Sequence, residues 1–163
     1  MRIEQSFVKS WQIASKTRPI KAKPLINLLV DRTVTSKFLV DCLEGKEPLR
    51  NGVVICIGEA GDVWQQMPKK LLQKYTVKAI DADGWMVCEP LPDNAVDCVE
   101  VTEAMSKGSV CFTIIGQWGA TTENEKNVQK GCVGDFLCRN RNDNTDWWVV
   151  NRKLFLNTYV IKS

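Results

Sequence analysis

The sequence predicts an α+β fold with a largely antiparallel sheet and short helices. Runs of β-prone residues outnumber helical ones, short turns join neighbouring runs, and one pattern of five residues occurs twice at the same spacing. A repeat of this kind indicates one structural unit used twice. We therefore expect a single compact domain over residues 1–163, in which pseudo-repeated strand–helix subunits at 25–80 and 109–163 share one core. The two copies of the pattern are Asp62, Trp64, Lys69, Leu72 and Tyr75, then Asp146, Trp148, Lys153, Leu156 and Tyr159.

The first half of the chain alternates short predicted elements with turns. Residues 1–16 have apolar side chains at helical spacing, 18–24 are expected to be an extended segment lying in solvent, and 25–34 are expected to be a strand. Ser36 is a candidate helix cap for a helix to Leu43. A buried strand is predicted at 53–57 and a helix from Pro68 to Tyr75. Residues 76–80 and 85–88 flank an Asp-Gly turn and predict a β-hairpin.

The second half is richer in predicted strands. Residues 94–101 alternate in polarity, and 109–118 form the longest β-prone run, which predicts a central strand. The polar segment 123–130 is either a short helix or a loop. Further strands are predicted at 133–139 and 147–150, followed by a helix at 152–158. Val160 and Ile161 are expected to pair at a sheet edge.

Basic residues gather near the N-terminus, where residues 1–24 hold six of them against Glu4. Acidic residues dominate positions 78–103, although the whole chain has a net charge of only +3. The basic segment predicts either nucleic-acid contact through Arg18, Lys21 and Lys23, or an ordinary charged face that attracts the acidic segment.

The chain contains seven cysteines and no histidine. Because no pair of cysteines has CxxC spacing and the N-terminus lacks the apolar run of a signal peptide, we expect reduced thiols in a cytoplasmic protein. No apolar run is long enough to span a membrane. The lack of histidine excludes Ser-His-Asp and Cys-His catalysis, and the cysteine spacings fit no zinc motif. We expect no metal, no cofactor and no catalytic residue.

The repeated pattern has two interpretations. In the first, each Trp–Leu–Tyr set is a buried stripe on a strand and the helix that follows it. In the second, the two copies line one groove through Trp64, Lys69, Trp148 and Lys153, which would suit a nucleobase, a nucleotide or an extended strand. A lysine stem can also lie along a Trp ring while its ammonium group stays in water.

The C-terminal third resembles small bacterial and phage domains of the family named for its PGDYG sequence. Gly134 and Asp135 match the opening of that motif, Trp148 its aromatic residue, and Phe155 with Tyr159 its helical end. Residues 61–75 are similar to a compressed second copy, with Leu71 in place of Phe155, and 112–119 are similar to the preceding strand. The chain has Val-Gly-Asp-Phe at 133–136 where the family has Pro-Gly-Asp-Tyr. The resemblance implies a bacterial or phage accessory protein, with no activity to carry over.

These observations predict a non-enzymatic protein that binds a protein partner, either another protein or a second copy of itself, or sequesters a small ligand. The alternative is nucleic-acid or nucleotide binding through the basic segment and the Trp/Lys pairs. An enzyme is the third hypothesis. It would depend on the carboxylates of Asp81, Asp83 and Glu89 or on Cys132 and Cys138, which flank a Gly-Asp turn.

Overall fold

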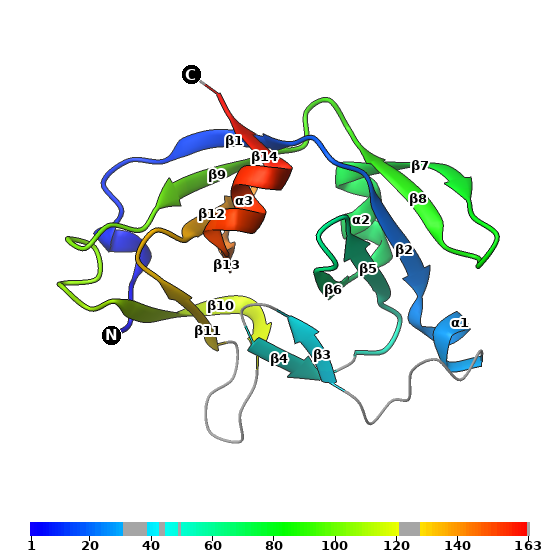
Figure 1. The fold of residues 1–163 in the computed structure, drawn as a ribbon, viewed down its shortest axis with the longest axis horizontal. Coiled ribbons are helices and arrows are strands. Elements are labelled where there is room, and N and C mark those ends of the chain that lie inside the picture. Colours follow the sequence, from blue (N-terminus) through cyan, green and yellow to red (C-terminus); the bar gives the residue numbers. More distant parts are fainter. Residues whose placement is uncertain (31–38, 43–44, 49, 121–127, 163) are drawn as a thin grey trace. The chain divides into compact units, whose positions relative to one another are not determined.

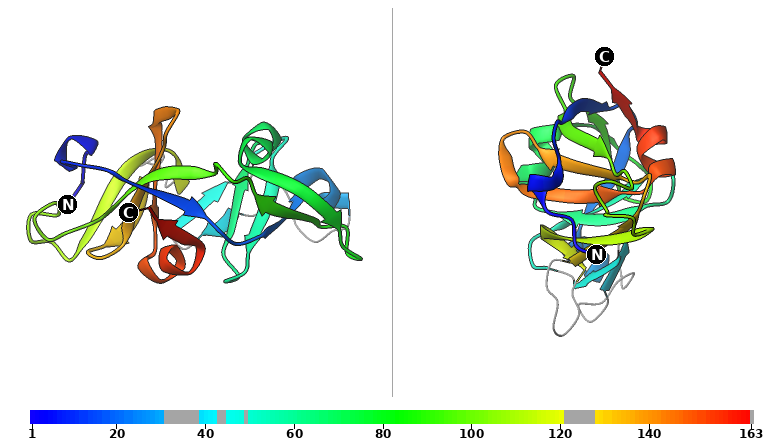
Figure 2. Two further views of the ribbon diagram at one scale, coloured as in Figure 1. Left: turned by 90° about the horizontal axis from the view of Figure 1, so that it is seen from above. Right: turned by 90° about the vertical axis from the view of Figure 1, so that its left-hand side faces the viewer.

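The computed structural model describes residues 1–30, 39–42, 45–48, 50–120 and 128–162. Among the described residues, antiparallel sheets predominate and the helices are few and short, which confirms the predicted α+β class with largely antiparallel sheets. Figure 1 labels the elements, and Figure 2 shows them from two further sides. Within the part of the chain that the structure describes, no helix has the length and the apolar character needed to cross a bilayer.

The elements follow one another closely along the chain. In order they are a 3-10 helix (Gln5–Phe7), β1 (Gln12–Lys16), β2 (Ile20–Pro24), α1 (Leu25–Val30), β3 (Leu39–Cys42), β4 (Gly45–Pro48), β5 (Val54–Gly58), β6 (Val63–Gln66), α2 (Pro68–Lys74), β7 (Tyr75–Ile80), β8 (Met86–Pro90), β9 (Ala95–Glu100), β10 (Cys111–Ala120), β11 (Val128–Cys132), β12 (Phe136–Asn140), β13 (Asp143–Val150), α3 (Arg152–Thr158) and β14 (Tyr159–Ile161).

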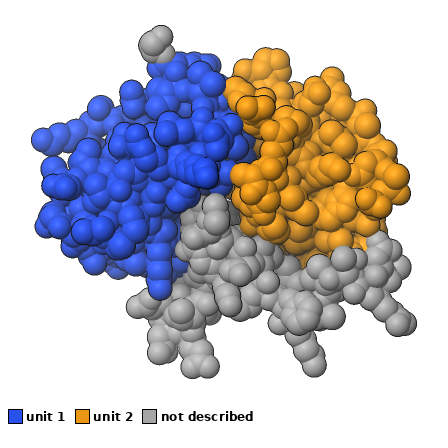
Figure 3. Space-filling view, in the orientation of Figure 1, with its two compact units in different colours: residues 1–16, 43–46, 95–163 blue, residues 17–42, 47–94 orange. Residues whose placement is uncertain are grey.

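The chain divides into two compact units, coloured separately in Figure 3. Unit 1 comprises Met1–Lys16, Leu43–Lys46 and Ala95–Ser163, and unit 2 comprises Thr17–Cys42 and Glu47–Asn94. These bounds differ from the predicted subunits at 25–80 and 109–163. Among the described residues, each cluster of buried apolar side chains draws its members from a single unit. Each unit therefore has apolar clusters of its own.

Unit 1 is built on a five-stranded antiparallel sheet in the order β13-β12-β9-β1-β14. One face packs against α3 through Phe155, which stacks on Phe136 with 3.8 Å between the ring centroids and on Tyr159 with 4.7 Å. The other face packs against the β10–β11 hairpin, where Phe112 and Ile114 are buried. The alternation of side chains along β12 and β13 supplies both faces.

Unit 2 has a second five-stranded antiparallel sheet, in the order β6-β5-β2-β8-β7. One face packs against α2 through Leu71, and Tyr75 at the start of β7 joins the same cluster. The opposite face of β5 packs against α1 through Leu25 and Leu28. The arrangement parallels unit 1, because in both units a helix connects the two edge strands of the sheet. Helix α2 connects β6 to β7, and α3 connects β13 to β14.

Strand β1 lies near the N-terminus, whereas the other strands of the unit 1 sheet come from residues after 94. β1 pairs with β9 and β14, although the next strand along the chain, β2, belongs to unit 2. In unit 2, β8 occupies the corresponding position, between β2 and the edge strand β7. Unit 2 is thus inserted between β1 and β9, and β1 completes a sheet otherwise formed by residues after 94.

The two copies of the sequence pattern follow the same path of strand, helix and strand. Trp64 and Trp148 lie in β6 and β13, and Tyr75 and Tyr159 open β7 and β14. The prediction that Leu72 and Leu156 belong to the buried stripe is wrong, because they are 58% and 53% exposed. The buried positions are the preceding residues, Leu71 and Phe155. That the two segments are copies of one ancestral unit stays a prediction.

Several predicted elements are confirmed. The β7–β8 hairpin, strands β5, β9, β12 and β13, both helices α2 and α3, and β14 at a sheet edge lie where the sequence places them. The strand predicted at 109–118 is β10, but it pairs with β11 in a two-stranded sheet and is not central. The segment 123–130 is predicted to be a short helix or a loop, but its described residues from Val128 belong to β11, and 123–127 lie outside the described residues.

Predictions near the N-terminus are mostly wrong. Gln12–Lys16 form β1, and helical structure there is limited to a single 3-10 turn. Residues 20–24 form β2, the central strand of unit 2, instead of an exposed segment. Leu25–Val30 is a helix where a strand is predicted. Of the helix predicted from Ser36 to Leu43, Leu39–Cys42 form β3, and the remaining residues lie outside the described part.

Candidate functional site

A pocket of about 280 Å³ lies in unit 2, where α1, α2 and the turn before β5 meet β2 and β8. Apart from Asn51, every side chain that lines it is apolar. Ligand sites are typically apolar concavities with a few polar groups, and this pocket has that character. The lining residues are Pro24, Leu25, Ile26, Asn51, Gly52, Val53, Val54, Pro68, Leu71, Leu72 and Met86.

Helix α2 forms one wall of the pocket because of how it begins. Pro68 occupies the first turn, where its missing N–H is not needed and its ring fixes a helical φ. Successive helical residues point about 100° apart. Leu71 therefore turns into the core and is 2% exposed, while Leu72 stands at the rim and is 58% exposed. Both line the pocket, so α2 contributes one buried and one exposed leucine.

The turn before β5 forms another part of the wall. Gly52 has φ +75°, a left-handed conformation that glycine adopts without steric cost, and with Asn51 it forms the turn before β5. Val53 then places its backbone carbonyl to accept from the N–H of Leu25, at 3.0 Å. This hydrogen bond fixes the start of α1 against β5.

Large apolar side chains surround the pocket and extend its apolar surface. Ile26 is 66% exposed and Leu72 is 58% exposed, and both belong to the lining. Met67, which directly precedes the lining residue Pro68, is also exposed. Single exposed apolar residues are ordinary on protein surfaces, whereas several at one pocket rim are typical of a binding site.

Basic residues lie on α2 and directly before the turn that lines the pocket. Helix α2 contains Lys69, Lys70 and Lys74 and no acidic residue, and Arg50 directly precedes the lining residue Asn51. The backbone N–H of Arg50 donates to Oε1 of the buried Gln65, at 3.0 Å. This bond fixes the segment that leads to the pocket wall. The site therefore combines an apolar pocket with a basic helix.

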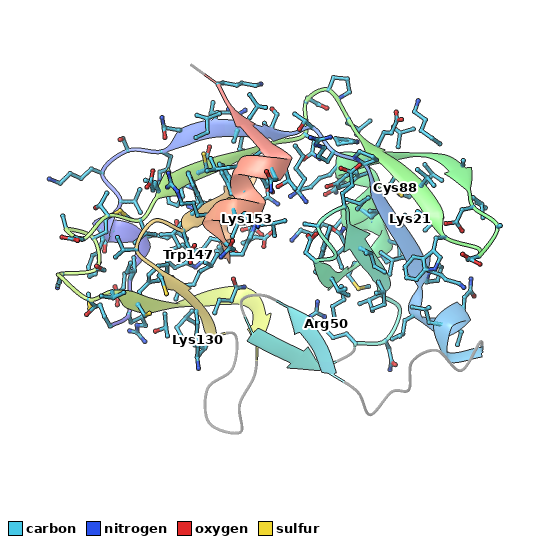
Figure 4. All side chains as sticks on the ribbon, viewed as in Figure 1. Lys21, Arg50, Cys88, Lys130, Trp147 and Lys153 are labelled. Atoms are coloured by element: carbon cyan, nitrogen blue, oxygen red, sulfur yellow. The ribbon has the colours of Figure 1, made fainter. Side chains whose placement is uncertain are left out.

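The four residues predicted to line one groove belong to two units. Trp64 and Lys69 lie in β6 and α2 of unit 2, whereas Trp148 and Lys153 lie in β13 and α3 of unit 1. Both Trp side chains are half-buried and pack against the core cluster of their own unit. Both lysines are exposed, and Lys153 is labelled on α3 in Figure 4. A groove that they share stays a prediction.

The cations proposed for nucleic-acid contact each have an acidic or aromatic neighbour within unit 2. Lys21, labelled in Figure 4, donates to Asp81 at 2.7 Å, and Arg18 lies 3.7 Å from Glu59. Lys23 is buried, donates to the backbone oxygen of Asp83 at 2.9 Å and lies over the Trp85 ring. Their charges are thus partly neutralised by the unit itself, which favours the interpretation of a charged face.

The carboxylates of the β7–β8 turn have a structural role. Oδ1 of Asp81 accepts from the N–H groups of Asp83 and Trp85, both at 2.9 Å. The hydrogen bond from Lys21 and those from the two backbone groups hold the pKa of Asp81 below its usual value. Among the described residues, no three Cys, Asp or Glu side chains gather closely enough to hold a metal ion.

The two cysteines considered for reactivity have different surroundings. Cys138 is fully buried in the core of unit 1, where a thiol packs as a small apolar group. Cys132 is exposed and lies across from Cys111. The Gly134-Asp135 turn beside it has a structural role: Gly134 has φ +97°, and the Asp135 carboxylate accepts from the N–H groups of Cys132 and Arg152.

The pocket was not predicted from the sequence. Its walls come from segments that are remote in the chain, so no local pattern indicates it. The available signal was Leu71-Leu72, because two adjacent leucines on a short helix cannot both face the same core. The five-residue pattern includes Leu72 but was interpreted as buried.

Comparison of the chain with models of protein families, with curated proteins and with solved structures found no match. The resemblance to the PGDYG family and a bacterial or phage origin therefore stay predictions.

Proposed function

We propose that the protein is a binding protein without enzymatic activity, and that unit 2 takes an apolar side chain of an acidic partner segment into the pocket beside α2. The observation that carries this proposal is the pocket of about 280 Å³ with exposed Ile26 and Leu72 at its rim. Burying such apolar surface against a partner contributes roughly 25 cal/mol per Å² before the costs of association.

The exposed apolar rim of the pocket supports a protein segment over a small molecule. Pockets for drug-sized ligands typically enclose roughly 300–1,000 Å³, so this one lies just below that range. It has room for one or two apolar side chains. The exposed rim continues the apolar surface beyond the pocket, and a peptide chain can cover the rim while one of its side chains enters.

The charge of α2 supports an acidic segment. Helix α2 carries Lys69, Lys70 and Lys74 and no acidic residue, and Lys69 is exposed. Opposite charge on a partner accelerates encounter and fixes its orientation, while a basic partner is repelled. Because these charges lie near the surface, we expect binding to weaken as salt is added.

Methyl NMR with short peptides tests the proposal. The probe is a pentapeptide with one phenylalanine between two pairs of glutamates, compared with its lysine counterpart and with a version in which glycine replaces phenylalanine. We expect the acidic phenylalanine peptide to shift the methyl signals of Leu71, Leu72 and Met86. The glycine peptide should leave them unshifted, and the lysine peptide should act at much higher concentration only.

Two outcomes would overturn the proposal. Equal methyl shifts with the acidic and the lysine peptides would contradict a role for the positive charge of α2. Absence of shifts at pocket methyls with all three peptides, at concentrations up to several millimolar, would remove the site. A single-stranded oligonucleotide added in parallel tests the nucleic-acid alternative, which predicts shifts near Arg18, Lys21 and Lys23 instead.

A further inference from the structure

Two cysteines of unit 1 lie opposite each other in the β10–β11 hairpin. Cys111 is the direct cross-strand partner of Cys132, and their Sγ atoms are 2.9 Å apart. Both side chains are exposed, whereas Cys56, Cys88, Cys98 and Cys138 are buried. A disulfide bond is about 2.05 Å long, so bond formation needs the two sulfur atoms to approach by about 0.9 Å.

The strand register suits a disulfide at this position. The N–H of Val133 donates to the carbonyl of Val110 at 2.8 Å, which makes these neighbours a hydrogen-bonded pair. Hydrogen-bonded and non-hydrogen-bonded pairs alternate along an antiparallel ladder, so Cys111 and Cys132 form a non-hydrogen-bonded pair. In such pairs the Cα atoms are about 4.5 Å apart and the side chains are closest, within the range that disulfides span.

Contacts on both strands hold the two thiols in place. On β11, the N–H of Cys132 donates to Asp135 at 2.8 Å, and Gln129 accepts from the N–H of Val149 at 2.8 Å. On β10, Phe112 and Ile114 are buried on the face opposite to Cys111. These contacts hold the backbone of both strands, so the Cys111 and Cys132 thiols stay close to each other.

The buried thiols are protected from the same chemistry. Burial, with the charge of Asp97 adding to it, raises the pKa of Cys98 to about 11. Burial also raises the pKa of Cys88, which Figure 4 labels in unit 2. Thiol–disulfide exchange needs both a thiolate and access, so these cysteines are poor competitors for an oxidant.

We propose that Cys111 and Cys132 are a reversible redox pair, which a small disulfide such as oxidised glutathione converts into a cross-strand disulfide between β10 and β11. One thiol, after losing its proton, attacks a sulfur of the small disulfide, forms a mixed disulfide and releases one reduced thiol. The second cysteine then attacks the protein sulfur of the mixed disulfide and releases the other reduced thiol. Two cysteine thiols are oxidised, and one small disulfide is reduced to two thiols.

The two thiols are close enough to affect each other. The hydrogen bond with Cys111 raises the pKa of Cys132, and burial and the charges of Cys111 and Asp135 add to this effect. Both thiols are exposed, so either can make the first attack, and the other then resolves the mixed disulfide.

Peptide mapping of the whole folded chain tests the pair. The protein is equilibrated with mixtures of reduced and oxidised glutathione, free thiols are blocked with N-ethylmaleimide, and the digest is examined by mass spectrometry. We expect a linked peptide containing Cys111 and Cys132, lighter by two hydrogen atoms, that disappears when reduced glutathione is added in excess. Cys98 should be blocked only after unfolding.

Single variants test the mixed-disulfide intermediate. Cys132→Ser should accumulate a stable mixed disulfide at Cys111, and Cys111→Ser should accumulate one at Cys132. Circular dichroism of each variant establishes that it is folded. Mixed disulfides at both positions of the native chain without a link between them would overturn the proposal, as would oxidation that links either cysteine to a different thiol.

Discussion

Cys138 lies directly across the β12–β13 ladder from Trp148, and in unit 2 Cys56 faces Trp64 in the same register. In each sheet the strand that carries this half-buried tryptophan leads directly into a helix, α3 in unit 1 and α2 in unit 2. Phe155 and Leu156 of α3 therefore correspond to Leu71 and Leu72 of α2. This correspondence gives matched pairs of positions for testing what is structural and what is functional.

The helix α3 should be anchored by Phe155 and not by the neighbouring Leu156. Phe155 is fully buried between Phe136 and Tyr159, so Phe155→Ala should lower the free energy of unfolding by about 3–5 kcal/mol. Leu156→Ala should change it by about 0.5 kcal/mol or less, since that side chain is 53% exposed. Urea unfolding followed by tryptophan fluorescence measures both, and equal losses would contradict the assignment.

Asn151 should stabilise the start of the same helix. Its side-chain oxygen accepts from the N–H groups of Lys153 at 3.0 Å and Leu154 at 3.4 Å. Replacing it by alanine removes this cap, and we expect a loss of about 1 kcal/mol in the free energy of unfolding. Asn151→Asp keeps an acceptor at the N-cap and should be close to the native chain in the same urea titration. An alanine variant as stable as the native chain would show that the cap has no effect.

Gly131 should not tolerate a side chain. A Cβ atom there would lie 2.7 Å from Cζ of Phe112 and 2.8 Å from Cγ1 of Val149, both within the core of unit 1. Gly131→Ala should therefore destabilise the protein by about 1–3 kcal/mol through overpacking. The exposed neighbour Lys130 is the control, and Lys130→Ala should leave the midpoint of thermal unfolding almost unchanged. A similar midpoint for both variants would contradict the close packing of β11.

The Lys21–Asp81 pair should make the free energy of unfolding depend on pH in the acidic range. The pKa of Asp81 is lowered in the folded state, chiefly by the hydrogen bond from Lys21. The stabilisation that ionised Asp81 gives the folded state is therefore complete above the unfolded-state pKa of about 3.9. It is lost as the pH falls through the lower pKa of the folded state. Asp81→Asn should lower the unfolding midpoint at neutral pH, and the difference from the native chain should shrink below about pH 4.

The exposed pair has a small effect, so the midpoint is measured as a difference between variant and native chain across a pH series. Asp93→Asn, at another exposed turn position, is the control. A difference for Asp81→Asn that is constant from neutral pH to pH 2 would contradict the role of its ionised form.

The sequence predicted local structure well where periodicity and turn signals agree. Helix α3 spans Arg152–Thr158 as expected, and the Asp81 turn closes the predicted hairpin. The apolar run Leu25–Val30 was misassigned because a short continuous run does not distinguish a strand from a buried helix. Residues 20–24 were misassigned because their lysines suggested solvent, whereas Lys23 lies buried with its ammonium group bonded to Asp83.

The functional features depended on tertiary contacts that no local pattern contains. The pocket joins α1, α2 and the turn at Asn51, and the thiol pair joins residues 21 positions apart through the register of a hairpin. The sequence singles out Cys132 because it flanks the Gly-Asp turn, whereas its partner Cys111 lies within the β-prone run 109–118 and carries no signal of its own.

The affinity of the acidic phenylalanine peptide for two matched glutamine variants tests the central claim most directly. Leu72→Gln removes an apolar side chain from the pocket rim, and Leu156→Gln makes the same change at the corresponding exposed position of unit 1. We expect fluorescence anisotropy of the labelled peptide to show a Kd about tenfold higher for Leu72→Gln, which corresponds to about 1.4 kcal/mol, and an unchanged Kd for Leu156→Gln. Equal affinities for both variants, or a loss confined to Leu156→Gln, would contradict binding at the pocket of unit 2.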